Sequence, residues 1–211
     1  DGLYHVQVKG LQHGKLFSEN RLITCVSGAI NPYTDFQEFL QSAENPDLSF
    51  IVSNTTEAGL MFNPADQNHE VLPESFPAKV TLLLYHRFKF FQGDPGKGLI
   101  LMPCELIDKN GAILKNILLQ YCALWKLPDA FVQWLTNHNT FCNSLVDRIV
   151  PGFPKETIAE LQEATGFKDH RAVSAEPFYL WVIEAPSFVQ QQFPTAKAGL
   201  LVKYVNDLTP Y

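Results

Sequence analysis

The chain has 211 residues, a mass of 23.8 kDa and a formal net charge of −6 at pH 7, and 46% of its residues are hydrophobic against 18% charged. Such a composition excludes a disordered chain and provides for one or two folded domains with a sizeable core. Lys and Arg are scattered, which argues against a nucleic-acid groove, and no uncharged apolar run approaches the roughly 20 residues of a membrane span.

The N-terminal part predicts antiparallel strands followed by a helix. Leu3–Lys9 alternates in polarity, Gly10–Gly14 supplies turn residues, and Leu16–Ser27 follows as one or two further strands. After a break in the chain, Thr34 or Asp35 can cap a helix that continues to about residue 43.

The middle of the chain alternates buried strands with helices. Leu48–Ser53 and Leu99–Met102 are short and nearly all apolar, which is typical of strands buried in a parallel sheet. The predicted helices are Ala78–Phe91, Ala112–Leu127 and Asp129–Asn137. This rhythm predicts an α/β layer. Since ligands bind beyond the carboxyl ends of such strands, the polar residues that directly follow the two strands are the candidates for a site.

A glycine-rich segment at residues 93–98 is predicted to be a turn and not a phosphate-binding loop. A phosphate loop follows a strand and opens a helix, so that backbone N–H groups point at the anion. This segment follows a predicted helix and opens a strand, and the chain contains neither a G-x-G-x-x-G motif nor a Walker loop.

After Pro151 the pattern changes to a short helix and further strands. The helix is predicted at Thr157–Thr165, with Gly166 at its end. The strands are predicted at Ala172–Ser174, Phe178–Ile183 and Leu200–Val205. We expect these strands to pair antiparallel.

The four cysteines do not form a C-x-x-C pair. Cys25, Cys122 and Cys142 lie inside apolar stretches, so the thiols are interpreted as buried and reduced. Reduced thiols favour a cytoplasmic location. No His or Cys lies at finger-like spacing to them, so no metal site is expected.

Three polar segments leave alternatives open when only their residues are considered. Ser53–Gly59 can be a helix cap with an acid in the first turn, or the hydroxyl and N–H lining of a cofactor crevice. Pro103–Gly111 can be a strand-to-helix loop whose acids face water. Asn143–Pro151 places Asp147 and Arg148 among apolar residues, where they can form a structural ion pair.

Four segments taken together resemble the mannitol dehydrogenase family of long-chain, metal-independent polyol dehydrogenases. They are Ser-Asn-Thr-Thr-Glu-Ala-Gly at 53–59, Pro-Cys-Glu-Leu-Ile-Asp-Lys-Asn-Gly at 103–111, Asn-Ser-Leu-Val-Asp-Arg-Ile-Val-Pro at 143–151 and Glu-Pro-Phe-Tyr-Leu-Trp-Val-Ile-Glu at 176–184. The resemblance runs in order through nearly the whole chain. The first two segments are most similar to the tagaturonate reductase, or altronate oxidoreductase, branch of the family.

The resemblance implies an α/β fold with a partial Rossmann-like parallel sheet, helices on both faces and an extension with antiparallel strands. Residues 1–150 are expected to be the remainder of an NAD-binding domain without its first βα unit. Residues 151–211 are expected to be a strand-rich extension leading to a helical catalytic domain. The family's glycine-rich turn is expected before Asp1, and its lysine motif is expected after Tyr211.

The implied activity is hydride transfer between NAD(H) and a small-molecule sugar acid, with D-altronate and D-tagaturonate as the couple. A lysine acts as general base, so this chain is expected to be inactive alone. Within the family, fructuronate reductase and mannitol 2-dehydrogenase are alternatives, and NADP remains an alternative to NAD. A non-catalytic module that binds a nucleotide or a partner protein is the alternative from another class.

The resemblance also implies roles for individual residues. The residues expected beside the cofactor are Ser53, Asn54, Thr55 and Glu57. The residues expected to contact the substrate are Glu105, Asn143 and Asp147. Asp147 is also expected to help the lysine lose its proton. Leu106 stands where mannitol 2-dehydrogenases have an asparagine that polarises the carbonyl, which puts mannitol and fructose in doubt as substrates.

Overall fold

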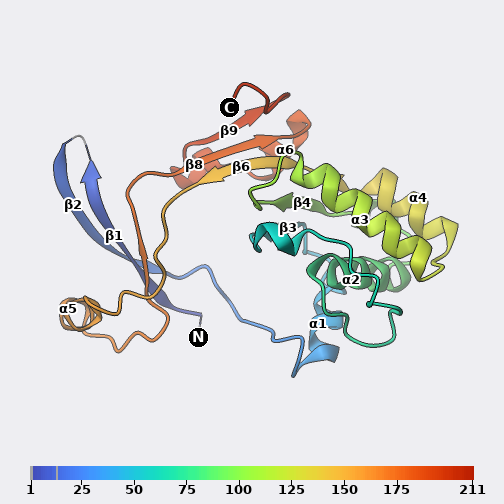
Figure 1. Cartoon of the computed structure of the whole chain (residues 1–211), viewed down its shortest axis with the longest axis horizontal. Coiled ribbons are helices and arrows are strands. Elements are labelled where there is room, and N and C mark those ends of the chain that lie inside the picture. The colour runs from blue at the N-terminus through green and yellow to red at the C-terminus, as the bar shows by residue number, and fades with distance from the viewer. Residues whose placement is uncertain (1, 13) are drawn as a thin grey trace. The chain divides into compact units, whose positions relative to one another are not determined.

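The computed structural model describes residues 2–12 and 14–211, and the chain divides into two compact units (Figure 1). Unit 1 comprises Asp1–Ala29 and Asp147–Leu180, and unit 2 comprises Ile30–Val146 and Trp181–Tyr211. The expected domain boundary between residues 150 and 151 stays a prediction. Among the described residues no helix is both long and apolar enough to cross a membrane.

Unit 1 contains a three-stranded sheet in the order β2-β1-β7. Its elements are β1 (Tyr4–Gln12), β2 (Lys15–Ile23), β7 (Val173–Ala175) and helix α5 (Ile158–Thr165). The strands β1 and β2 form the expected antiparallel hairpin, with Tyr4 opposite Ile23 and Gln12 opposite Lys15. β7 adds to β1 in parallel.

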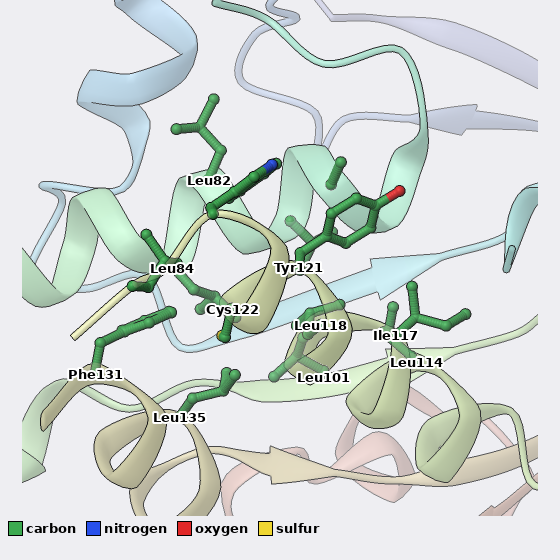
Figure 2. Close-up of a cluster of buried hydrophobic side chains, with 14 of the residues drawn as sticks. Leu82, Leu84, Leu101, Leu114, Ile117, Leu118, Tyr121, Cys122, Phe131 and Leu135 are labelled. Atoms are coloured by element: carbon green, nitrogen blue, oxygen red, sulfur yellow. The ribbon is translucent and has the colours of Figure 1, made fainter. Parts of the chain in front are cut away.

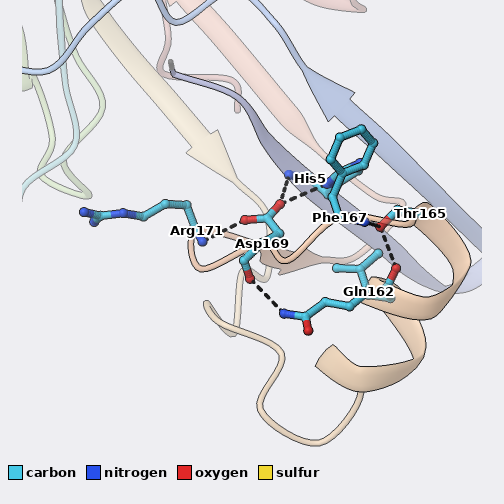
Figure 3. Close-up of polar contacts among 7 residues, drawn as sticks. His5, Gln162, Thr165, Phe167, Asp169 and Arg171 are labelled. Atoms are coloured by element: carbon cyan, nitrogen blue, oxygen red, sulfur yellow. Dashed lines mark hydrogen bonds and ion pairs between the residues drawn. The ribbon is translucent and has the colours of Figure 1, made fainter.

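A buried polar pair fastens β1 to the segment after α5 (Figure 3). The Asp169 carboxylate accepts the backbone N–H of His5 at 2.6 Å, and the Nδ1 atom of His5 lies 2.9 Å from the same oxygen. Its other oxygen accepts the backbone N–H of Arg171 at 2.8 Å. Burial acts to raise the pKa of Asp169, but these hydrogen bonds outweigh it and hold that pKa below its ordinary value.

Unit 2 is built around a parallel sheet in the order β3-β4-β5. Its strands are β3 (Phe50–Ser53), β4 (Ile100–Pro103) and β5 (Thr140–Phe141). Its helices are α1 (Phe36–Ser42), α2 (Phe76–Phe90), α3 (Asn110–Leu124), α4 (Asp129–His138) and α6 (Ser187–Gln192). The predicted strands and the three predicted helices of this region are therefore present, with ends shifted by at most three residues. Helix α2 begins where the Ser75 hydroxyl accepts the N–H of Ala78, with Pro77 in the first turn.

Both faces of β4 are covered. Leu101 packs into a cluster formed mainly by α2, α3 and α4, which includes Leu118 and Phe131 (Figure 2). Its neighbours Ile100 and Met102 belong to a second cluster, with side chains from α6 and from the strand that precedes it. Because successive side chains of a strand point to opposite faces, this division shows helices on both sides of the sheet and confirms the predicted α/β layer.

The turn at 93–98 lies between α2 and β4, as predicted. It contains the 3₁₀ turn η2 (Pro95–Lys97), whose start is capped by the Asp94 carboxylate accepting the Gly96 N–H at 2.8 Å. It opens a strand and not a helix, which leaves no helix N-terminus for a phosphate.

A third sheet has the order β6-β8-β9. Its strands are β6 (Asn143–Asp147), β8 (Leu180–Glu184) and β9 (Val202–Val205). The expected antiparallel pairing is wrong for two of the strands after Pro151, because β9 runs parallel to β8. The physical reason is the connection between β8 and β9, where α6 and η3 (Thr195–Ala198) form a crossover that returns the chain in the same direction.

Three of the four thiols are buried. Burial raises the pKa of Cys122 and of Cys142 to about 12, and it also raises the pKa of Cys104. Cys25 is exposed, so its assignment as a buried thiol was wrong. It lies in the irregular segment between β2 and α1, and a short apolar run without regular structure did not suffice to bury it.

Candidate functional site

The loops that follow β3 and β4 are joined by one carboxylate. Glu105, which is only 2% exposed, lies two residues after β4. Its Oε1 atom accepts the Thr55 N–H at 2.9 Å and the Thr55 hydroxyl at 2.8 Å, and its Oε2 atom accepts the Ser53 hydroxyl at 3.1 Å. Three of the residues expected in the site are thus brought together at the carboxyl end of the parallel sheet.

A hollow of about 510 Å³ opens beside these loops. It is lined by Asn54, Thr55, Thr56, Ala58 and Leu106. The lining offers one side-chain amide, two hydroxyl groups and two apolar side chains, and none of the five residues is charged. The Leu106 side chain is 62% exposed and so is available for contact with a ligand. This mixture suits a ligand with hydroxyl or amide groups on one side and an apolar face on the other.

The loop after β4 is fixed to β6 by buried side chains. Asn110 is completely buried, and its amide nitrogen donates to the carbonyl oxygens of Glu105 and Ser144 at 2.9 and 2.8 Å. Its amide oxygen accepts the N–H groups of Gly111 and Ser144, both at 2.9 Å. The Ser144 hydroxyl donates to the carbonyl oxygen of Pro103. All four hydrogen-bonding positions of the Asn110 amide are used, which rigidifies the loop that carries Leu106.

Asn143 joins three elements. Its amide oxygen accepts the N–H of Ala112 in the first turn of α3 at 3.1 Å, and its amide nitrogen donates to Glu184 at 2.7 Å. The other carboxylate oxygen of Glu184 accepts the N–H of Leu208 at 2.8 Å. Asn143 is therefore engaged in structural hydrogen bonds, and its contact with a substrate stays a prediction.

Asp147 ends β6 and is exposed, and it belongs to unit 1. Its neighbour Arg148 donates to the carbonyl oxygen of Glu176 at 3.0 and 2.8 Å and lies over the ring of Tyr179. The alternative of an ion pair between Asp147 and Arg148 is thus wrong, because the guanidinium is directed to a backbone carbonyl. The roles of Asp147 in substrate binding and in deprotonating a lysine stay predictions.

The remaining expected site residues are Asn54 and Glu57. Asn54 is exposed and lines the hollow. The backbone of Glu57 begins the 3₁₀ helix η1 (Glu57–Gly59), and its side chain lies outside the described part of the structure. The alternative that this segment is a capped helix start receives no support from Thr56, whose side chain makes no capping hydrogen bond.

Sequence reasoning missed the supporting residues Asn110, Ser144 and Glu184. Their partners lie far away in the chain or in backbone groups, so no local pattern identifies them. Gly111, which directly precedes the predicted helix Ala112–Leu127, lies in the first turn of α3 in the structure. A Cβ atom there would lie 2.1 Å from the carbonyl oxygen of Cys142, which explains the glycine by close packing of α3.

The sequence profile of the mannitol dehydrogenase Rossmann domain matches residues 11–197. The chain belongs to the mannitol dehydrogenase family. This confirms both the resemblance and the Rossmann-type α/β fold that it implied.

Curated members of the mannitol dehydrogenase family are similar over the whole chain. The altronate oxidoreductase of Yersinia enterocolitica is 48% identical over 212 residues, and that of Bacillus subtilis is 44% identical over 211 residues. Each alignment covers 100% of this chain and 44% of the relative. The chain therefore spans less than half the length of these relatives.

Solved structures with the same fold include two polyol dehydrogenases. D-Sorbitol dehydrogenase in its substrate-free form has a TM-score of 0.76 and 25% identity, over 98% of this chain and 43% of its own. Mannitol 2-dehydrogenase of Pseudomonas fluorescens, in a ternary complex with NAD and D-mannitol, has a TM-score of 0.74 and 23% identity, over 99% and 43%. These neighbours support the fold of this member of the family.

Proposed function

We propose that the chain is part of an NAD-dependent oxidoreductase that interconverts D-tagaturonate and D-altronate. The assignment of the substrate rests on the similarity to altronate oxidoreductases over the full chain. The observation that carries the site is the hollow at the carboxyl ends of β3 and β4, where parallel sheets bind their ligands. The buried thiols of Cys104, Cys122 and Cys142 support a reducing, cytoplasmic location for this enzyme.

The residues around the hollow fit one part of a dinucleotide. The Asn54 amide and the hydroxyl groups of Thr55 and Thr56 can hydrogen-bond to ribose hydroxyls or to a carboxamide, and Leu106 can contact a ring face. This combination of hydrogen-bonding and apolar groups suits the nicotinamide riboside end of the dinucleotide. When bound, NAD accepts or donates the hydride.

The chain's own residues have binding and orienting roles in this proposal. Ser53, Asn54, Thr55 and Glu57 form the cofactor side of the site. Asn143 and Asp147 keep the substrate-binding roles that the family resemblance implies, and Asp147 also helps a lysine outside these 211 residues to lose its proton. A carboxylate near a lysine can fix the ammonium group for proton transfer, and burial lowers the pKa of such a lysine. The chain alone is accordingly expected not to turn over substrate.

The experiment is an NADH oxidation assay on the complete product of the parent gene, with D-tagaturonate, D-fructuronate and D-fructose offered separately. Rapid loss of NADH absorbance with D-tagaturonate alone supports the proposal. Turnover of another ketose would keep the family and correct the substrate, and a parallel assay with NADPH assigns the cofactor. If the folded protein oxidises no NADH with any of the three, the non-catalytic module replaces the enzyme.

A control separates binding from catalysis. The complete protein should bind NADH, as seen by energy transfer from its tryptophans, and the 211-residue chain should show no turnover. Robust turnover by this chain alone would contradict the assignment of the general base to a residue outside it.

A further inference from the structure

Glu105 is a buried carboxylate whose partners are neutral. Its three side-chain hydrogen bonds come from Ser53 and Thr55, and no salt bridge to Glu105 is present among the described residues. Removing a carboxylate from water is unfavourable unless its oxygens are hydrogen-bonded, so these donors stabilise the position of the group. The carboxylate and the loop after β3 consequently hold each other in place.

Thr55 is fixed from two directions. Its N–H and its hydroxyl both donate to one oxygen of Glu105. On the other side it contacts Gly59, where an added Cβ atom would lie 2.1 Å from the Thr55 hydroxyl oxygen. The N–H of Gly59 in turn donates to the carbonyl oxygen of Thr56 at 2.7 Å. The conformation of Thr55 therefore depends on Glu105 and on the absence of a side chain at Gly59.

The residues on either side of Thr55 are free to bind a ligand. Asn54 and Thr56 are exposed, line the hollow, and have no side-chain partner within residues 2–12 and 14–211. Because Ser53 and Thr55 are both tied to Glu105, the backbone that carries Asn54 and Thr56 is fixed as well. Glu105 is held in turn through its own carbonyl oxygen by the buried amide of Asn110.

We propose that Glu105 is a positioning residue, which shapes the hollow through Ser53 and Thr55 and does not itself contact the ligand. The link to cofactor binding rests on the function proposed above. The carboxylate acts here as a set of hydrogen-bond acceptors, and its negative charge is not required by the ligand. An amide of the same shape should therefore replace it with little loss, whereas an apolar side chain should not.

The test compares Glu105→Gln and Glu105→Ala in the 211-residue chain. The Gln oxygen can accept both Thr55 donors, and its nitrogen can donate to the Ser53 hydroxyl, so the loop should stay in place. The first measurement is hydrogen exchange of the Thr55 amide, which needs no ligand. We expect faster exchange in Glu105→Ala and a rate close to wild type in Glu105→Gln. Unchanged exchange in a folded Glu105→Ala variant would overturn the proposal.

The second measurement is the dissociation constant for NADH. Glu105→Ala is expected to weaken binding by about tenfold or more, because it removes all three hydrogen bonds that fix Ser53 and Thr55, and Glu105→Gln by less than about threefold. Equal losses in both variants would overturn the proposal, because the charge itself would then be needed. These dissociation constants are measured on the complete product of the parent gene, because the glycine-rich turn of the cofactor site is expected outside these 211 residues. Failure of the complete wild-type protein to bind NADH would refute the proposed function, while the amide exchange still decides the role of Glu105.

Matched variants guard against misfolding and unspecific effects. Asp108→Ala removes an exposed carboxylate from the same loop and should change neither measurement. If Glu105→Ala does not fold, Thr55→Val takes its place, because it removes one of the two Thr55 donors and conserves the shape of the side chain. A folded Thr55→Val variant with wild-type exchange and affinity would count against the proposal.

Discussion

The guanidinium of Arg87 donates a hydrogen bond of 2.6 Å to the carbonyl oxygen of Ala43, the residue that ends α1. Arg87 is 1% exposed, and burial lowers its pKa. It also donates to the carbonyl oxygens of Asn45, Leu48 and Lys97 at 2.9, 3.1 and 2.7 Å. The Arg87 side chain thereby connects the end of α1 with the segments that precede β3 and β4. These segments lie at the amino ends of the two strands, whereas the hollow lies at their carboxyl ends.

Replacing Arg87 with Met should destabilise the protein strongly. The substitution removes four hydrogen bonds and leaves the buried carbonyl oxygen of Ala43 without the Arg87 donor, so we expect a loss of about 2–5 kcal/mol in the free energy of unfolding. Urea denaturation followed by tryptophan fluorescence measures it. Arg21→Met on β2 is the control, because Arg21 is exposed and its ion pair with Glu19 lies at the surface, and it should change stability by less than about 0.5 kcal/mol. Equal effects of the two substitutions would refute the structural role of Arg87.

The hydrogen bonds to the Asp169 carboxylate make the free energy of unfolding depend on pH. The pKa of Asp169 in the folded protein lies below the ordinary value of 3.8, so its contribution is complete above that value. The contribution is lost as the pH falls through the lower folded pKa, because protonation removes the charged acceptor of the His5 and Arg171 donors. Asp169→Asn should lower the free energy of unfolding by about 1–3 kcal/mol at neutral pH. The difference in stability between this variant and wild type should shrink as the pH falls below the folded pKa of Asp169.

Denaturation by urea at a series of pH values measures this difference. Glu160→Gln is the control in the same unit, since Glu160 is 75% exposed and lies 3.9 Å from Lys9. That variant should follow the wild-type curve. If the difference in free energy of unfolding between Asp169→Asn and wild type stays constant down to strongly acidic pH, hydrogen bonds to the ionised Asp169 are not its cause.

The strands β3 and β4 and the helices α2, α3 and α4 were predictable because local signals and burial agree there. β4 is a run of apolar residues, and the structure buries all four of its residues between two layers. The register of β6, β8 and β9 was not predictable in the same way. β6 begins with the polar pair Asn143-Ser144, and its partner β8 is separated from it by the whole of α5 and β7. α6 has only six residues, too few for a periodic pattern to be recognised.

The position of the candidate site was predictable, but its internal hydrogen bonds were not. The rule that ligands bind beyond the carboxyl ends of parallel strands identified both Ser53 and Glu105. That a glutamate would accept hydrogen bonds from Thr55, about fifty positions away in the sequence, has no local signature. The same holds for Asn143, whose amide is engaged by Ala112 and Glu184.

The exposure of Cys25 predicts a single fast-reacting thiol. Cys104, Cys122 and Cys142 are buried and burial raises the pKa of each, so they should react with an aromatic disulfide reagent only when the chain unfolds. We expect one of four thiols to react rapidly at neutral pH, and the rest after addition of denaturant. Cys25→Ser should abolish the rapid phase. A rapid phase that persists in this variant would place another thiol at the surface.

At position 111, helix propensity favours alanine whereas close packing favours glycine. Gly111 is the second residue of α3, and propensity alone favours Ala over Gly inside a helix by about 1 kcal/mol. A Cβ atom at this position would lie 2.1 Å from the carbonyl oxygen of Cys142, so α3 would have to move away from the strand beside it. We expect Gly111→Ala to lower the free energy of unfolding by about 1–3 kcal/mol, the usual cost of overpacking.

The matched control is Gly28→Ala. No atom lies within 4 Å of a Cβ atom built at Gly28, and its backbone is outside the left-handed region. This substitution should leave stability within about 0.5 kcal/mol of wild type or raise it slightly, because Ala restricts the unfolded chain more than Gly does. Thermal and urea denaturation of both variants decide the matter. If Gly111→Ala is as stable as Gly28→Ala, the close approach of α3 to the Cys142 carbonyl is not the reason for glycine at this position.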